Sequence, residues 1–192
     1  MSEISEDCPL IKSLGPPYPA LSQGGFNCLM GYFAEALRVE GDVAEVGVYE
    51  GGTALFLCEW VRGLGKELYL FDNFLGFQPT AEDYPLAIFE GGYKGVEEEV
   101  RELFKEEDKV HIVTGDCVET IKEVEDKTFC FVHLDLDLYV PTKACLEFFP
   151  DRMSKGGIIM VHDYHELAGV SKAVREVVGD LPPEESYAVI RA

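Results

Sequence analysis

Two groups of acidic and histidine residues follow apolar runs that are typical of buried strands, and together they could hold a metal ion. Asp135 and Asp137 follow the first run, and His162 and Asp163 follow the second. If these strands are neighbours in a parallel sheet, their carboxyl ends meet at one edge, where ligands gather. Carboxylate oxygens with room for water are the usual ligands of Mg²⁺, and a histidine also admits Mn²⁺. We therefore predict a metal site formed by Asp135, His162 and Asp163, with Asp137 in support.

Two other interpretations of these residues stay open. Acidic residues at strand ends can be merely solvated or can cap the next helix, although converging acids repel one another unless a cation joins them. His133 and Asp135, with a histidine after the next strand, also form a two-histidine, one-carboxylate set of the kind that binds Fe(II). The candidates for that second histidine are His162 and His165. His133 lies in the apolar part of its strand, where a lone histidine is more often a core residue.

A third group surrounds a glycine-rich turn after the first predicted strand. Glu45 and Gly47 end the strand, and Gly51, Gly52 and Thr53 open the helix that follows. Glycines let the backbone approach a ligand closely, and the helix offers free N–H groups to an anion. The nicotinamide fingerprint G-x-G-x-x-G is absent, and an acid before the glycine suits an ammonium group better than a pyrophosphate. Plain strand-to-helix architecture would also account for the turn.

The next two predicted strands each end in an aspartate that could bind part of a nucleoside. Asp72 could accept both hydroxyls of a ribose, and Asp116 could hold an adenine amine. Asp72 could equally be solvated, and Asp116 could only cap the helix that starts at Cys117. An acid or a glycine at three successive strand ends nevertheless indicates a binding site for a nucleoside that carries an amino-acid end. S-adenosylmethionine is the common cofactor of that description.

These side chains can meet only if the strands end at one edge of a sheet. The order of strands and helices along the chain predicts such a sheet. Strands and helices alternate about five times with short connections, which is typical of a doubly wound parallel α/β fold. Residues 73–92 are rich in aromatic residues, Gly and Pro, and we interpret them as a lid. We expect a single domain over residues 1–192 with an irregular lead-in over residues 1–26. The predicted strands are residues 43–48, 67–71, 110–114, 128–134, 158–161 and 187–190, and the predicted helices include residues 27–39, 93–106, 117–124, 142–149 and 170–178.

The composition excludes several classes of protein. The 192 residues carry a formal net charge of −20, which repels the phosphates of nucleic acids, and no basic patch offsets it. No apolar run is long enough to span a bilayer and no secretory leader is evident, so the cytoplasm is the expected compartment. The six cysteines contain no C-x-x-C pair, so we expect them to be reduced.

The sequence resembles the macrocin O-methyltransferase-like family of class I, S-adenosylmethionine- and metal-dependent enzymes. The resemblance covers roughly residues 24–178, and its most specific part is the acid-rich strand end paired with the later Asp-Tyr. It is carried by GDVAEVGVYEGG (41–52), FDNFLGF (71–77), DLDLY with PT two residues on (135–142), and SKGG through HDY (154–164). The resemblance implies a Rossmann-like, mostly parallel sheet of a class I methyltransferase, here shortened at both ends.

The resemblance also implies a role for each residue singled out above. Glu45, with Gly47, Gly51 and Thr53, would hold the methionine end of S-adenosylmethionine, while Asp72 would hold its ribose and Asp116 its adenine. Asp135 would be both a metal ligand and the general base, with His162 and Asp163 completing the metal site. The implied cofactor-binding residues are Glu45, Gly47, Tyr49, Gly51, Gly52, Thr53, Asp72, Asn73, Asp116 and Cys117.

Members of that family methylate sugar hydroxyls of antibiotics, so we expect an O-methyltransferase for a sugar or another small diol-bearing substrate. The expected cofactors are S-adenosylmethionine and Mg²⁺ or Mn²⁺, although the family often has Asp where this chain has His162. We also expect a homo-oligomer, a dimer, and no nucleic-acid or membrane partner. Two alternatives remain: a non-catalytic S-adenosylmethionine-binding scaffold protein on the same fold, and an Fe(II) hydroxylase.

Overall fold

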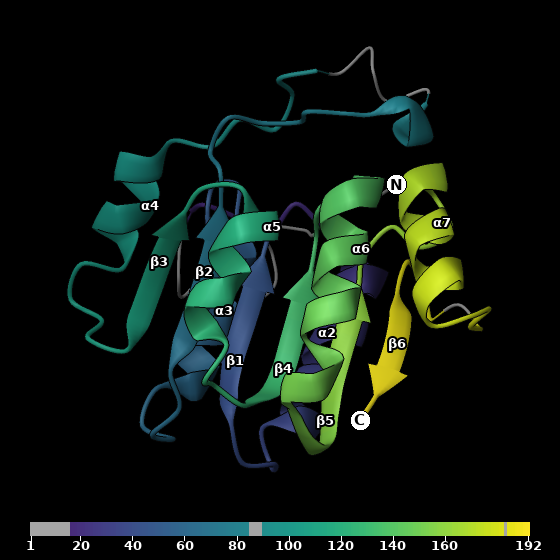
Figure 1. The fold of residues 1–192 in the computed structure, drawn as a ribbon. Helices are drawn as coiled ribbons and strands as arrows, with labels where there is room; N and C mark the ends of the chain where they lie inside the picture. Colours follow the sequence, from purple (N-terminus) through teal and green to yellow (C-terminus); the bar gives the residue numbers. More distant parts are fainter. Residues whose placement is uncertain (1–15, 85–89, 183) are drawn as a thin grey trace.

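A six-stranded sheet forms the centre of the computed structural model, which describes residues 16–84, 90–182 and 184–192 (Figure 1). The strands stand in the order β3-β2-β1-β4-β5-β6. The first five are parallel to one another, and β6 pairs antiparallel with β5. This arrangement confirms the predicted doubly wound, mostly parallel α/β sheet. The strands are β1 (Asp42–Val46), β2 (Leu68–Asp72), β3 (Val110–Thr114), β4 (Phe129–Leu134), β5 (Met153–Val161) and β6 (Ala188–Arg191).

Helices cover both faces of the sheet and form two apolar cores with it (Figure 1). Successive side chains of a strand point to opposite faces, so in β1 Val43 joins one core while Ala44 and Val46 join the other. A sheet that is buried on both faces needs continuous apolar strands, and every residue of β4 is buried. One face carries α2 (Gln23–Ala36), α3 (Gly52–Val61) and α4 (Glu97–Leu103), and the other carries α5 (Cys117–Thr120), α6 (Tyr139–Phe148) and α7 (Ala168–Val177).

Strand β5 is longer than its predicted apolar stretch of residues 158–161, because the two glycines before that stretch lie in a bulge. Phe129 of β4 pairs with Met153, whereas Phe131, two residues on, pairs with Ile158. The extra β5 residues must loop out locally, and Gly156 has φ +86°, a conformation that glycine adopts at little cost. The two glycines before the predicted strand are therefore part of β5.

Two predicted helix starts are each four residues away from the observed ones. Helix α2 begins at Gln23, so the last four residues of the predicted lead-in, 1–26, are helical. The Ser22 hydroxyl accepts the N–H of Gly25 at 3.0 Å and caps the helix, which outweighs the helix-breaking tendency of the glycines. The helix predicted over residues 93–106 begins only at Glu97, because Tyr93 has φ +53° and cannot belong to a right-handed helix.

The predicted lid crosses over the carboxyl ends of the strands (Figure 1). Its described residues contain one short 3₁₀ helix, η1 (Ala81–Asp83), and residues 85–89 lie outside the described part of the chain. In the residues that the structure describes, no helix combines the length and the apolar character needed to cross a membrane. The fold thus brings one long segment over the strand ends at which the candidate residues were predicted.

Candidate active site

A cavity of about 330 Å³ opens at the carboxyl ends of the strands. It includes residues that follow β1 and β4, the two central strands between which the strand order reverses. This reversal is where ligands bind in open α/β sheets, because the connections on its two sides diverge and leave a crevice. From the residues predicted to form the site, the cavity wall contains Glu45, Gly47, Tyr49, Gly52, Thr53, Asp72, Asn73, Asp116, Cys117, Asp135, His162 and Asp163.

The glycine turn after β1 is shaped by close backbone contacts. Gly47 has φ +93°, and a Cβ atom on it would overlap the carbonyl oxygen of Asp135. Only glycine can therefore bring the β1 and β4 ends together at this point. Gly51, predicted to bind the cofactor, lies outside the cavity wall. It is the N-cap residue of α3 and has φ +85°. A Cβ atom at this position would point toward Leu103.

Glu45 lines the cavity with a buried carboxylate, of which one oxygen has no hydrogen-bond partner in the described residues. Its side chain is only 1% exposed, and its Oε1 lies 2.9 Å from Nδ1 of His133. Burial raises the pKa of the Glu45 carboxyl, and the hydrogen bond from His133 acts in the opposite direction. Oε2 is buried and has no hydrogen-bond partner in the described part of the chain. A buried, unpaired carboxylate oxygen is costly, and an ammonium group is the kind of ligand that would satisfy it.

Asp72 organises the turn as well as lining the cavity. Its Oδ2 accepts the N–H groups of Val48 and Tyr49 at 2.7 and 2.8 Å, and its Oδ1 accepts the N–H of Phe74 at 2.7 Å. A carboxylate offers about four lone-pair positions, so at least one is left for a ligand hydroxyl. The ribose-binding role of Asp72 stays a prediction.

Asp116 caps the helix after β3, as the simpler interpretation of this residue required. Its Oδ1 accepts the N–H of Val118 at 3.0 Å at the start of α5. Asp116 and the buried Cys117 also line the cavity, just after β3, the strand that pairs with β2 and Asp72. Capping therefore does not exclude the predicted contact with adenine.

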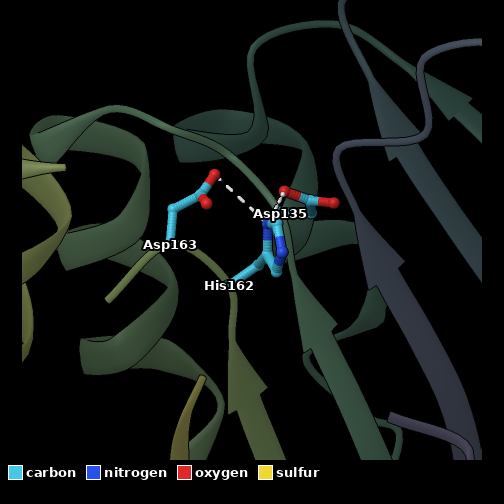
Figure 2. Close-up of side chains that lie close together, drawn as sticks. All are labelled: Asp135, His162 and Asp163. Carbon is cyan, nitrogen blue, oxygen red and sulfur yellow. Dashed lines mark hydrogen bonds and ion pairs between the residues drawn. The ribbon is translucent and has the colours of Figure 1, made fainter. Parts of the chain in front are cut away.

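Asp135, His162 and Asp163 converge at the ends of β4 and β5 (Figure 2). One ligand atom from each lies within 4.8 Å of the others. Nδ1 of His162 lies 3.1 Å from Oδ1 of Asp135 and 3.2 Å from Oδ2 of Asp163. The parallel pairing fixes the backbone here, since the N–H of Asp135 donates to Val46 and that of His162 donates to Leu134, both at 2.9 Å.

Close approach shifts the pKa values of the histidine and the carboxyl groups at this strand edge. Burial alone would lower the pKa of His162, but the carboxylates of Asp135 and Asp163 raise it to about 11. Burial, the charge of Asp135 and a hydrogen bond to Asp163 raise the pKa of Asp137 to about 9. Burial would raise the pKa of Asp135, yet the charge of His162 lowers it. The neighbouring carboxylates thus favour the charged form of His162, and burial beside Asp135 favours the neutral form of Asp137.

The donor set fits a divalent cation. The two carboxylates already lie on either side of Nδ1 of His162. Together with that nitrogen they could bind a metal ion. The ion would have to displace the proton on Nδ1 of His162. The partly exposed side chains of Asp135 and Asp163 border the cavity, which leaves room for water or substrate oxygens on the ion.

The two-histidine set considered for Fe(II) is not assembled in the described residues. His133 is fully buried and bonds to Glu45 rather than joining Asp135. His165 is exposed, and its ring packs at a tilt against the ring of Tyr164, with the ring centroids 4.1 Å apart. The interpretation of His133 as a core residue is confirmed.

Several cavity residues were not among the predicted site residues. The lid contributes Phe77, Gln78 and Thr80, and the residues before α2 contribute Tyr18 and Ala20. Four of the lining residues that are not glycine have positive φ, which is uncommon and clusters at functional sites. These are Tyr49, Tyr93, Asp137 and Asp163.

The lid is fastened to α6 by a buried aspartate that the sequence did not single out. Asp83 is 2% exposed, and its Oδ1 accepts the N–H of Tyr139 at 2.6 Å. Its Oδ2 accepts the N–H and the hydroxyl of Thr80, each at 2.8 Å. Because Tyr139 is the first residue of α6, four residues after Asp135, the lid is tied to the same segment as the acidic cluster.

Replacing Asp83 with Asn is expected to loosen this junction. One carboxylate oxygen becomes an NH₂ donor that faces other donors, and a buried hydrogen bond to a charged group is worth about 1–3 kcal/mol. We expect the free energy of unfolding in urea to fall by that amount, and hydrogen exchange to accelerate in peptides containing Thr80 and Tyr139. Glu82→Gln is the control, because Glu82 is exposed and, among the described residues, contacts only Thr80 and, at 3.9 Å, Lys172. Equal behaviour of the two variants would contradict the role of Asp83.

Comparisons with known proteins agree with this geometry. The chain matches the family described as Macrocin-O-methyltransferase (TylF) over residues 23–179. It is 28% identical over 167 residues to an 8-demethyl-8-(2,3-dimethoxy-alpha-L-rhamnosyl)-tetracenomycin-C 4'-O-methyltransferase of Streptomyces olivaceus, covering 73% of this chain and 64% of the relative. It is 27% identical to a demethyldecarbamoylnovobiocin O-methyltransferase of Streptomyces niveus, covering 72% of this chain and 58% of the relative. The chain thus spans less than two thirds of each curated relative.

A solved structure supports the fold independently. The O-methyltransferase NovP superposes with a TM-score of 0.78 at 22% identity, covering 92% of this chain and 82% of that one. At this identity the likeness establishes the fold alone, and the fold is that of a class I methyltransferase.

Proposed function

The chain belongs to the macrocin O-methyltransferase (TylF) family, and from this premise we propose that it is an S-adenosylmethionine-dependent O-methyltransferase. The acceptor is a hydroxyl of a sugar or another small diol-bearing molecule, and a divalent ion, Mg²⁺ or Mn²⁺, assists the transfer. The observation that carries this proposal is the convergence of Asp135, His162 and Asp163 beside a cavity that Glu45 also lines, the Oε2 of Glu45 having no partner within the described ranges. The proposal of a sugar acceptor follows the relative from Streptomyces olivaceus, which is named as a methyltransferase for a rhamnosyl-bearing tetracenomycin.

The cofactor would lie along the strand ends from β1 to β3. Glu45 would bind the ammonium of its methionine end, Asp72 its ribose and Asp116 its adenine. The glycine turn leaves room for the cofactor because Gly47 carries no side chain. Cavity residues from the lid would cover the bound molecules and exclude water, which strengthens every charge interaction inside.

In the transfer itself, the chain orients the acceptor and removes its proton. When bound, S-adenosylmethionine would supply the methyl group from its sulfonium, and a divalent ion held by Asp135, His162 and Asp163 would lower the pKa of the acceptor hydroxyl. Asp135 would accept the hydroxyl proton as the general base. The methyl carbon would exchange its bond to sulfur for a bond to the acceptor oxygen. Holding the two reactants in line is the larger part of the catalysis.

The primary test combines binding and turnover. Calorimetry should detect binding of S-adenosylhomocysteine, and radiolabelled methyl should pass from S-adenosylmethionine to rhamnosyl glycosides in the presence of Mg²⁺ or Mn²⁺. A protein with no affinity for either cofactor form would refute the proposal. Binding without transfer to any of a broad set of diol acceptors would instead favour the non-catalytic scaffold.

Removing divalent ions is expected to abolish most of the transfer. A metal that stabilises developing charge is worth several kcal/mol, so dialysis against EDTA should slow transfer at least about 100-fold, and added Mg²⁺ or Mn²⁺ should restore it. Affinity for S-adenosylhomocysteine is the internal control, and it should hold because Glu45 and Asp72 are not among the three clustered residues. Full turnover in EDTA would refute metal assistance and leave the methyltransferase proposal standing.

A further inference from the structure

Glu45 and His133 form a buried polar pair between the two central strands. They are direct partners in the parallel register of β1 and β4, and both side chains point to the face covered by α2 and α3. Their side chains are 1% and 0% exposed, and Oε1 lies 2.9 Å from Nδ1. Burying a carboxylate and an imidazole in an apolar core costs free energy that their mutual hydrogen bond only partly offsets. Such a pair calls for a functional explanation.

The hydrogen bond to His133 occupies one oxygen of the Glu45 carboxylate, and the second oxygen is free to bind a ligand. Oε1 is occupied by His133, whereas Oε2 has no partner in the described residues and Glu45 belongs to the cavity wall. The other ring nitrogen of His133, Nε2, is also buried without a partner in this part of the chain. The bond to Glu45 is thus the polar contact that the ring makes there, so the ring acts on the site through Glu45.

We propose that His133 is a positioning residue, which holds the Glu45 carboxylate so that Oε2 receives the ammonium group of an amino-acid ligand end. The inference rests on the proposed use of S-adenosylmethionine. A glutamate side chain has three rotatable bonds, and fixing it in advance removes an entropic cost from ligand binding. His133 is not among the residues that line the cavity, so it would act on the ligand through Glu45.

The test compares two nucleosides that differ in their amino-acid end. S-adenosylhomocysteine carries that end, and 5′-methylthioadenosine lacks it. In His133→Leu the dissociation constant of S-adenosylhomocysteine should rise about 10- to 100-fold, the range for losing a hydrogen bond to a charged group, while that of 5′-methylthioadenosine changes less than about threefold. Glu45→Gln should give the same selective loss. Calorimetry on the intact chain measures both constants.

Two amide variants keep the test decisive if the leucine variant does not fold. Asparagine places its amide where Nδ1 lies, so His133→Asn should retain most of the affinity for S-adenosylhomocysteine. Glutamine places its amide near the position of Nε2, so His133→Gln should resemble the leucine variant. Val132→Ala is the matched core control: Val132 is equally buried but faces the other core, so the ratio of the two constants should not change.

The outcomes distinguish the positioning role of His133 from the proposed binding of S-adenosylmethionine, on which it rests. If the wild-type protein binds both nucleosides and the ratio of their constants is the same in all His133 variants, the positioning role is refuted and the cofactor proposal stands. If the wild-type protein binds neither, the cofactor proposal fails and this inference fails with it. A selective loss in His133→Leu or His133→Gln that His133→Asn avoids would establish the role.

Discussion

Replacing Asp135 with Asn is expected to lower the turnover number for methyl transfer by about 10²- to 10⁴-fold, the usual contribution of a general base. The amide cannot accept the acceptor's proton, and it removes one negative charge from the group that would hold the metal. Affinity for S-adenosylhomocysteine should stay within about threefold of wild type, because Glu45 and Asp72 lie on other strand ends. Radiolabel transfer and calorimetry measure the two quantities separately.

Asp137→Asn is the matched control for that substitution. The two residues are two positions apart and border the same cavity, yet Asp137 is not among the three converging side chains. Its carboxyl forms a hydrogen bond with Asp163. An asparagine amide can donate that bond, so we expect a loss of turnover below about tenfold. Comparable losses in the two variants would contradict the assignment of Asp135 as the base.

The strand ends could be predicted from the sequence because their signals are local. An apolar run that stops at an acid or a glycine marks both the strand and its exit, as at Asp72 and Asp135. The predicted convergence of Asp135, His162 and Asp163 needed only one further assumption, that the two strands are neighbours. The register between β4 and β5 confirms that assumption.

Contacts between distant segments could not be predicted in this way. Asp83 lies in a segment without periodicity, and its partner Tyr139 is 56 residues away. The pairing of Glu45 with His133 depends on the register of β1 against β4, to which neither strand's own pattern points. The bulge at Gly156 depends on a register shift in the same way. Local patterns therefore located the acids, and long-range packing determined what each one contacts.

Gly47→Ala is expected to cost about 2–6 kcal/mol of folding free energy. An alanine at φ +93° is strained, and its Cβ would overlap the carbonyl oxygen of Asp135, so strain and overpacking each contribute about 1–3 kcal/mol. Urea unfolding measures the loss. Methyl transfer should fall with it, because relieving the overlap shifts the backbone of Asp135 relative to His162.

Gly63→Ala separates the two contributions. Gly63 has φ +80°, but a Cβ there meets no atom within 4 Å, so only the backbone strain of about 1–2 kcal/mol should remain. The difference between the two variants is then the free energy of the close approach between the β1 and β4 ends. Equal losses of stability would mean that the chain accommodates a side chain at Gly47 by a shift that leaves the strand ends in place. In that case the requirement for glycine would come from backbone conformation alone, and the juxtaposition of the cofactor turn with Asp135 would need another cause.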